Sequence, residues 1–386
     1  MSRFIARRIE NFPEYIFSRL AKQVADVEQT TGRKVLSFGA GTPDVRPSKK
    51  YIEKLSEFLN EPDAHLYPGY GAIPEFASAL MSWYKKRFGV DLTEHELLPL
   101  LGAKDGISHL PLALADEGDE VLVPNPGYPG FTGPALMLGI RIVTYDLLES
   151  NDFKLDLTEL EKKLTDKTKF VWINFPSNPT GQVATITEIK KVVDWAKQRQ
   201  VFLVYDNAYS EITFDGFRAP SIMQIPGAKD IAVEIGSFSK SFSFAGFRMG
   251  WIVGNPEVIA ALAKVKSQVD SGMSIPLQKL GAFALTHPDA SWHNKMIASY
   301  KSRRDIILSR LTNLGLDFVL PKGGLYVWAK IKDPNVSSEE FCMRLLGEKQ
   351  VLVTPGTVFG KNGEGFVRIS ICVNIDNIDE YLPPAF

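Results

Sequence analysis

Between about residues 100 and 255, short and strongly apolar runs alternate with segments of helical periodicity. Runs such as 120–124 and 201–206 are rich in β-branched and aromatic residues and are too short to be helices, so we interpret them as buried strands. Between two such runs, residues 186–198 place Ile189 and Val193 on one helical face. Strands that alternate with helices form mostly parallel sheets that are covered on both faces, so the sequence predicts an α/β fold. Further strands of the same type are predicted at 170–174, 231–235 and 251–253.

The last hundred residues have a different pattern. A long helical stretch at 288–314 is followed by short strand patterns around 325–328 and 366–370, which is typical of a smaller α+β unit. Near the N-terminus, an amphipathic helix around 15–27 precedes a Gly/Pro turn, and we expect this segment to pack on the same small unit. The predicted division is a large domain at 46–285 and a small domain made of 1–45 and 286–386.

The composition excludes several classes of protein. Lys and Arg total 44 against 45 Asp and Glu, so nothing indicates a nucleic acid or an anionic membrane as a partner. There is no apolar run of about 18 residues that would span a membrane, and the first residues lack the apolar core of a signal peptide. Cys342 and Cys372 can pair, but two cysteines do not form a disulfide framework. We therefore expect a cytoplasmic protein, and we predict no metal site.

Lys240 lies in a segment, residues 237–250, that combines serines with four phenylalanines and ends near Arg248. A lysine amine can form an imine with an aldehyde cofactor, while hydroxyls and an arginine can hold that cofactor's phosphate. The alternative is a solvated surface lysine in a serine-rich loop. The flanking phenylalanines are too apolar for such a loop, which favours a lysine drawn toward the interior.

A second candidate is the glycine-flanked turn at 102–106, which precedes the helical run 107–115. A helix that opens on glycine presents unpaired N–H groups and a partial positive charge to an anion, and Lys104 can add a full charge. Turns of this kind are also common as purely structural connections.

Two further polar sites follow predicted strands. Asn178 lies in a turn made rigid by two prolines and Gly181, and it either offers its amide to a cofactor or belongs to a simple connection. Asp206 directly follows an apolar run, where an unpaired carboxylate is costly. A cationic partner such as a protonated pyridine nitrogen would stabilise it, with Tyr209 near a ring hydroxyl; the alternative is that Asp206 caps the next helix.

Arg368 lies inside the apolar run 366–371. An arginine in such surroundings usually makes a specific bidentate contact. The candidates are the carboxylate of a substrate and an internal Asp or Glu.

Taken together and in order, these motifs resemble the class I/II pyridoxal-phosphate-dependent aminotransferases of fold type I over essentially the full chain. The most specific motifs are Asn-Pro-Thr-Gly at 178–181, Asp-Asn-Ala-Tyr at 206–209 and Ser-Phe-Ser-Lys at 237–240. The resemblance implies a large domain with a mostly parallel seven-stranded sheet between helices and a small α+β domain. It also implies pyridoxal 5'-phosphate as cofactor and a homodimer with shared active sites.

The resemblance implies a role for each matching residue. Lys240 would be the Schiff-base lysine and proton shuttle, Asp206 would pair with the ring nitrogen, and Asn178 and Tyr209 would bind the ring oxygen. Tyr128 would stack on the ring. The phosphate would be held by Ala103, Lys104, Ser237, Ser239 and Arg248, with Tyr67 from the partner subunit. The substrate carboxylate would be held by Arg368 and Asn178 near the backbone of Gly41, with Tyr15 and Tyr70 as pocket walls or, alternatively, as core or interface packing.

Residues 12–15, 65–71, 84–89 and 209–216 look like the LL-diaminopimelate aminotransferase-like branch. This branch implies ping-pong transfer from an L-amino acid to a 2-oxo acid, with 2-oxoglutarate or pyruvate as the acceptor. No arginine occurs between Arg248 and Arg303, where animal-type aspartate aminotransferases carry their side-chain carboxylate arginine. The alternatives are a β-eliminating carbon–sulfur lyase on the same scaffold and, more remotely, a catalytically silent regulator. The stretch after Arg368 is short for this family, so we expect a reduced terminal helix.

Overall fold

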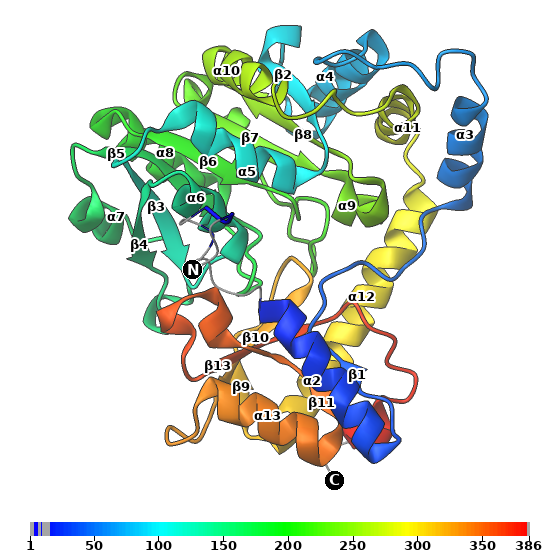
Figure 1. The fold of residues 1–386 in the computed structure, drawn as a ribbon, viewed down its shortest axis with the longest axis vertical. Helices are drawn as coiled ribbons and strands as arrows, with labels where there is room; N and C mark the ends of the chain where they lie inside the picture. Colours follow the sequence, from blue (N-terminus) through cyan, green and yellow to red (C-terminus); the bar gives the residue numbers. More distant parts are fainter. Residues whose placement is uncertain (1–3, 7–8, 10–15, 384–386) are drawn as a thin grey trace.

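The computed structural model describes residues 4–6, 9 and 16–383. Its centre is a seven-stranded sheet with the strand order β2–β8–β7–β6–β5–β3–β4 (Figure 1). Strand β8 runs antiparallel to both of its neighbours, and all other neighbouring pairs are parallel. The expected mostly parallel seven-stranded sheet is therefore present. The strands are β2 (Leu97–Leu100), β3 (Glu120–Asn125), β4 (Arg141–Asp146), β5 (Thr168–Asn174), β6 (Phe202–Asp206), β7 (Ala232–Ser237) and β8 (Gly250–Gly254).

Helices cover both faces of this sheet. On one face, α8 (Ile186–Arg199) buries Ile189 and Val193 in the same apolar cluster as Val171 and Leu203. On the other face, α5 (Ala103–Leu114) and α10 (Pro256–Lys266) pack in a cluster that contains Trp172 and Val204. The alternation of side chains along β5 and β6 supplies both clusters. The remaining helices of this part are α3 (Lys49–Leu59), α4 (Pro74–Phe88), α6 (Gly133–Met137), α7 (Leu157–Lys163), α9 (Phe238–Ser241) and α11 (Ile275–Thr286).

Local sequence explains the ends of α8 well. Thr185 and Glu188 form a capping box at its N-terminus, and Gln200 takes a left-handed conformation (φ 53°) that ends the helix. The predicted helix at 186–198 therefore has its expected start and extends one residue further.

Helix α12 (Ala290–Leu311) leads from the large sheet to a smaller unit (Figure 1). There, β12 (Thr354–Pro355), β13 (Phe366–Ser370), β10 (Tyr326–Ile331) and β9 (Leu316–Phe318) form an antiparallel sheet in that order. This sheet shares an apolar cluster with α12 and α13 (Ser338–Lys349). Because the antiparallel sheet is separate from the central one, the smaller α+β unit predicted from the sequence is present.

The N-terminal segment contributes α2 (Ile16–Thr31), which runs four residues beyond the predicted end at residue 27. Strand β1 (Leu36–Ser37) then pairs in parallel with β11 (Val351–Leu352), so residues 36–37 lie on the smaller unit. This pairing supports the proposed grouping of 1–45 with 286–386, although the boundaries themselves stay predictions. After β13, α14 (Ile378–Tyr381) is only four residues long.

Within the described ranges, none of the helices combines the length and the apolar character that crossing a bilayer requires. The same ranges contain no group of three or more His, Cys, Asp or Glu residues arranged to hold a metal ion. Cys342 and Cys372 are buried free thiols, so the pairing that the sequence left open does not form.

Candidate active site

The carboxyl ends of β5, β6 and β7 meet at one edge of the central sheet. Asn174 lies opposite Asp206, which in turn lies opposite Ile235, two residues before Ser237. A cavity of about 310 Å³ opens at this edge, as expected for ligand sites in α/β sheets. Ten of the eleven predicted cofactor residues line it, namely Ala103, Lys104, Tyr128, Asn178, Asp206, Tyr209, Ser237, Ser239, Lys240 and Arg248.

Lys240 lies on the short helix α9, whereas the sequence indicated only a polar turn. Phe238 and Phe244 are fully buried beside it, which draws the lysine toward the interior as expected. Its Nζ donates a hydrogen bond to the carbonyl of Gly41 at 2.6 Å and lies 5.9 Å from the centre of the Tyr209 ring. The amine is therefore held inside the cavity by the N-terminal segment.

Asp206 is 5% exposed at the end of β6. Its Oδ1 accepts the N–H of Ala208 at 3.1 Å, so it caps a turn rather than an α-helix. Burial raises the pKa of Asp206 to about 7, and the Ala208 N–H and the Lys240 charge oppose this shift only in part. A cationic group placed next to Asp206 would restore its ionised form. A protonated ring nitrogen is such a group, and it needs an ionised carboxylate beside it.

Arg368 is buried on β13 and reaches the rim of this cavity through Asn178. Its guanidinium donates to Asn178 Oδ1 at 3.1 Å and to the carbonyl of Gly39 at 2.7 Å. It also lies 4.1 Å from the centre of the Tyr326 ring and 4.6 Å from that of Phe359. These two acceptors, an amide oxygen and a backbone carbonyl, carry no formal charge, and a guanidinium group is well suited to bind an anion.

Tyr326, at the start of β10, lines the cavity but was not predicted as a site residue. Its hydroxyl is 3.4 Å from that of Tyr209, and the two rings meet edge to face. Burial, followed by the proximity of Tyr326, raises the pKa of Tyr209 well above its usual value, which keeps that phenol protonated as a hydrogen-bond donor. In sequence, Tyr326 resembles any aromatic residue of a buried strand, so no local signal marks it.

The opposite end of the cavity has the features of an anion site. Helix α5 begins at Ala103, so Lys104 belongs to its first turn and not to a preceding loop as the sequence indicated. Gly102 has φ 85°, and a Cβ there would lie 2.4 Å from Arg248 Nη2. The N-terminus of α5 is thus open toward the Arg248 guanidinium. Ser237 and Ser239 add hydroxyls at the same cavity, and Ser237 Oγ accepts the N–H of Ser239 at 3.1 Å.

Besides Arg368, three described residues that were predicted for the site are not among those that line the cavity. Tyr67 and Tyr70 are 85% and 53% exposed and are outside the cavity of their own chain. The carbonyl of Gly41 accepts a hydrogen bond from Lys240, and the carbonyl of Gly39 accepts one from Arg368. A Cβ at Gly41 would overlap the Tyr326 hydroxyl, which explains the glycine. Tyr15 lies outside the described residues.

The donor set around the cavity fits pyridoxal phosphate. The helix N-terminus, Arg248 and the serine hydroxyls match a phosphate, while the buried carboxyl of Asp206 matches a cationic ring nitrogen. Lys240 supplies an amine within the same cavity. The roles of the individual residues stay predictions. The polar groups of the cavity are nevertheless of the kinds that the phosphate, the ring nitrogen and the aldehyde of pyridoxal phosphate require.

Comparison with known proteins gives the family. Residues 33–382 match the family model for aminotransferases of class I and II. The chain is 40% identical to the LL-diaminopimelate aminotransferase of Aquifex aeolicus, covering 97% of this chain and 96% of that one. It is 38% identical to a glutamate-pyruvate aminotransferase of Escherichia coli, covering 96% and 90%. Among solved structures, apo-BacF from Bacillus subtilis superposes with a TM-score of 0.92 at 32% identity, covering 98% and 97%.

The chain belongs to the class I and II aminotransferase family. It is a pyridoxal-phosphate-dependent aminotransferase with the fold type I architecture. The resemblance to this family seen in the sequence is confirmed, and neither the eliminating lyase nor the regulator is favoured by these matches.

Proposed function

We propose that this aminotransferase moves the amino group of an L-amino acid to a 2-oxo acid in two half-reactions, with Lys240 as the group that carries the cofactor and moves the proton. The observation that supports this most directly is the arrangement of one cavity. It holds the Lys240 amine, the Asp206 carboxyl and the cationic N-terminal end of α5. Pyridoxal phosphate, when bound, supplies an aldehyde for the amino group and a ring that accepts negative charge from the substrate α-carbon.

The residues of this chain would divide the work as follows. Asp206 would hold the ring nitrogen in its charged form, because a buried carboxyl with a raised pKa gains most from a cationic neighbour. Asn178 and Tyr209 would donate to the ring oxygen, and Tyr128 would pack on the ring. Lys240 Nζ, once released from the cofactor, would take the proton from the α-carbon and return it to the cofactor carbon.

Arg368 would grip the α-carboxylate of the substrate together with Asn178. Its guanidinium already lies against Asn178 and two aromatic rings, so its orientation is fixed before the substrate arrives. A fixed orientation lowers the entropic cost of placing the α-carbon within reach of Lys240.

We also propose a homodimer with shared sites, in the cytoplasm. Tyr67 and Tyr70 lie on an exposed segment together with Leu66, and all three side chains are more than half exposed in the single chain. An aromatic and aliphatic surface of this kind favours burial against a second copy, where Tyr67 would reach the phosphate of the partner's cofactor.

For the substrate, we propose 2-oxoglutarate or pyruvate as the acceptor, with LL-diaminopimelate, glutamate and alanine as the first donors to test. The support comes from the relatives, which are named LL-diaminopimelate and glutamate-pyruvate aminotransferases. No arginine occurs between Arg248 and Arg303. Arg303 itself pairs with Asp44 at 2.7 Å, so it is engaged within the chain and is not proposed to bind a substrate side chain.

The test is a spectroscopic screen of the purified holoenzyme. Each L-amino acid is added alone, and the correct donor should convert the absorbance of the resting cofactor to that of its amino form, which a 2-oxo acid then reverses. Lys240→Ala should lower turnover by about 10⁴-fold or more, whereas Lys264→Ala, an exposed lysine of α10, should leave it unchanged. Release of pyruvate and ammonia from cysteine without any 2-oxo acid would contradict the proposal and favour a lyase.

A further inference from the structure

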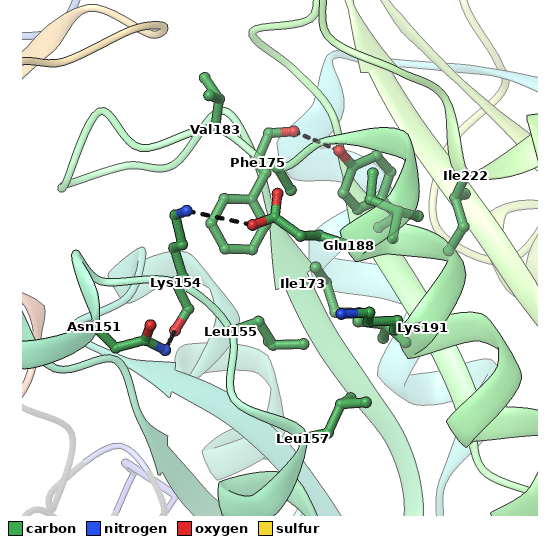
Figure 2. Close-up of a pocket in the computed structure, with 14 residues that line it drawn as sticks. Asn151, Lys154, Leu155, Leu157, Ile173, Phe175, Val183, Glu188, Lys191 and Ile222 are labelled. Atoms are coloured by element: carbon green, nitrogen blue, oxygen red, sulfur yellow. Dashed lines mark hydrogen bonds and ion pairs between the residues drawn. The ribbon is translucent and has the colours of Figure 1, made fainter.

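A second cavity lies on the other side of the strands that form the active site. Its volume is about 290 Å³, and it is bounded by β5, β6, α8 and the segment before α7 (Figure 2). Ile173 and Tyr205 line it and lie opposite each other in the sheet, while the next residues, Asn174 and Asp206, turn to the catalytic side. The two cavities share no lining residue.

The interior of this second cavity is apolar. Six of the side chains that line it are Leu155, Leu157, Ile173, Phe175, Ile189 and Val192. The Tyr205 hydroxyl donates a hydrogen bond to the carbonyl of Phe175 at 2.7 Å, so it needs no acceptor from a bound ligand. A ligand that fills this space must therefore present hydrocarbon to it.

Three charged side chains lie at the rim. Lys154 and Glu188 turn toward each other with a separation of 3.5 Å (Figure 2). Glu188 is already engaged, because its other oxygen accepts the N–H of Thr185 at 2.7 Å and its hydroxyl at 2.8 Å in the cap of α8. Lys191 follows on the same helix, exposed, and no described residue pairs with it. Lys154 is thus paired with Glu188, and Lys191 leaves the rim with one net positive charge.

From this combination we propose that the second cavity binds an aliphatic monocarboxylate with a chain of about six to eight carbons. The chain would fill the apolar interior, and the carboxylate would stay at the hydrated rim beside Lys191 and Lys154, because a charge is costly inside an apolar cavity. The site is separate from the one that binds the amino acid, and it does not depend on the proposed transamination. Its occupant contacts the backs of the strand ends that carry Asn174 and Asp206.

The probe is octanoate, titrated into the holoenzyme by isothermal calorimetry, with hexanoate and octyltrimethylammonium, which cannot form an imine with the cofactor, as comparison ligands. Octanoate should bind with one site per chain and about fifteenfold more tightly than hexanoate, since each buried methylene contributes about a fourfold gain. Octyltrimethylammonium should bind more weakly than octanoate, because its positive charge repels Lys191.

Variants locate the bound molecule. Leu157→Trp should fill the cavity and weaken octanoate binding at least about tenfold. Lys191→Gln should weaken octanoate binding about threefold. Lys190→Gln is the matched control, because the neighbouring Lys190 pairs with Asp194 and lies outside the cavity. Arg368→Lys should leave octanoate binding unchanged. Cofactor absorbance and thermal unfolding confirm that each variant folds; Lys191 is exposed, so that variant remains informative if Leu157→Trp does not fold.

Two results would overturn the proposal. One is the absence of octanoate binding to the wild type at millimolar concentration. The other is binding that survives both Leu157→Trp and Lys191→Gln but is lost in Arg368→Lys, which would place the carboxylate in the catalytic cavity.

Discussion

The two faces of the paired strands β5 and β6 are both apolar along most of their length, but they differ sharply where the strands end. On the catalytic face, Asn174 and Asp206 end the strands with polar groups. On the opposite face, Ile173, Phe175 and Tyr205 line an apolar cavity. The backbone is common to both faces, so the pleat alone separates a titrating carboxyl from hydrocarbon.

The difference shows where this fold accepts a cost in stability. The catalytic face buries a carboxyl whose ionised form is disfavoured until a cation joins it. On the opposite face, the buried hydroxyl of Tyr205 is satisfied by the Phe175 carbonyl. Substitutions on the two faces should therefore have opposite signatures: large kinetic effects with little or no loss of stability on the catalytic face, and the reverse on the apolar face.

The largest expected effect is that of Asp206→Asn. Burial raises the pKa of Asp206 to about 7 from 3.8, so the folded cofactor-free protein keeps this proton over a pH range in which the unfolded chain releases it. Asp206 should therefore contribute a loss of stability as pH rises from about 4 to 7, which is measured as the difference between the wild type and the variant. The variant should lack this loss and gain up to about 4 kcal/mol at pH 8, while its turnover falls by at least about 10²-fold. Urea unfolding of the cofactor-free protein at pH 5 and 8 measures the first effect.

The exposed Asp166→Asn is the control for this experiment and should change neither quantity. If the difference in stability between the wild type and Asp206→Asn is the same at pH 5 and pH 8, Asp206 is already ionised in the folded protein, and the contrast between the two faces loses its electrostatic basis.

Next in size is Arg368→Lys, which removes the planar fork that we assign to the substrate carboxylate. We expect kcat/KM for the amino acid to fall about 10²-fold, mainly through KM. The matched variant is Arg304→Lys, because Arg304 is equally buried but pairs with Asp215 within the chain at 2.7 Å. Steady-state kinetics with unfolding curves separate the two: Arg304→Lys should lose stability and keep its KM. Equal KM values for wild type and Arg368→Lys would remove Arg368 from the binding site.

A smaller effect is expected at the phosphate end. Gly102 and Gly118 have nearly equal φ angles, 85° and 87°, but a Cβ at Gly102 would meet Arg248 while the space at Gly118 is open. Either glycine changed to alanine should lose about 1 kcal/mol of stability from the backbone strain. Only Gly102→Ala should also weaken the binding of the cofactor, by about tenfold, because the added Cβ forces Arg248 to move. Fluorescence titration of the cofactor-free variants measures the affinity for the cofactor. Equal affinities for the two variants would show that the Gly102 turn takes no part in phosphate binding.

The smallest effect tests the apolar face. Tyr205→Phe removes the hydroxyl that satisfies the buried Phe175 carbonyl, and it should cost about 1 kcal/mol of unfolding free energy. Turnover should stay within about twofold of the wild type. Tyr145→Phe is the equivalent change elsewhere, because that hydroxyl donates to the Trp172 carbonyl at 2.8 Å. If Tyr205→Phe alone alters turnover strongly, the two faces are coupled through β6.

Much of the fold could be predicted because the strand and helix periods are local. The runs that become β3, β5, β6, β7 and β8 are short and apolar, and α8 carries its own cap. Strand β4 was not singled out, because it lies at the edge of the sheet and most of its residues are only half-buried. The residues of α9 were interpreted as a turn, because four residues are too few to show a helical period.

The candidate site was predictable where its residues follow strands, since the carboxyl ends of parallel strands gather at one edge. It was not predictable where the contact is made across the chain. Tyr326 approaches Tyr209 over a separation of 117 residues, and no feature of the run 325–328 announces it. Lys266 in α10 is buried against Asp105 in the first turn of α5, although an isolated lysine in a helix usually faces water.

By itself, the sequence determined the α/β architecture, the family and the residues that gather around the cofactor cavity, because periodicity and short motifs are properties of neighbouring residues. Only the tertiary structure decided what those residues touch. The carbonyls of Gly39 and Gly41 meet Arg368 and Lys240 from 329 and 199 residues away. Asp206 acquires its raised pKa from burial, which is a property of the assembled core. The apolar cavity behind the strands likewise exists only where α8 and the segment before α7 pack on the sheet.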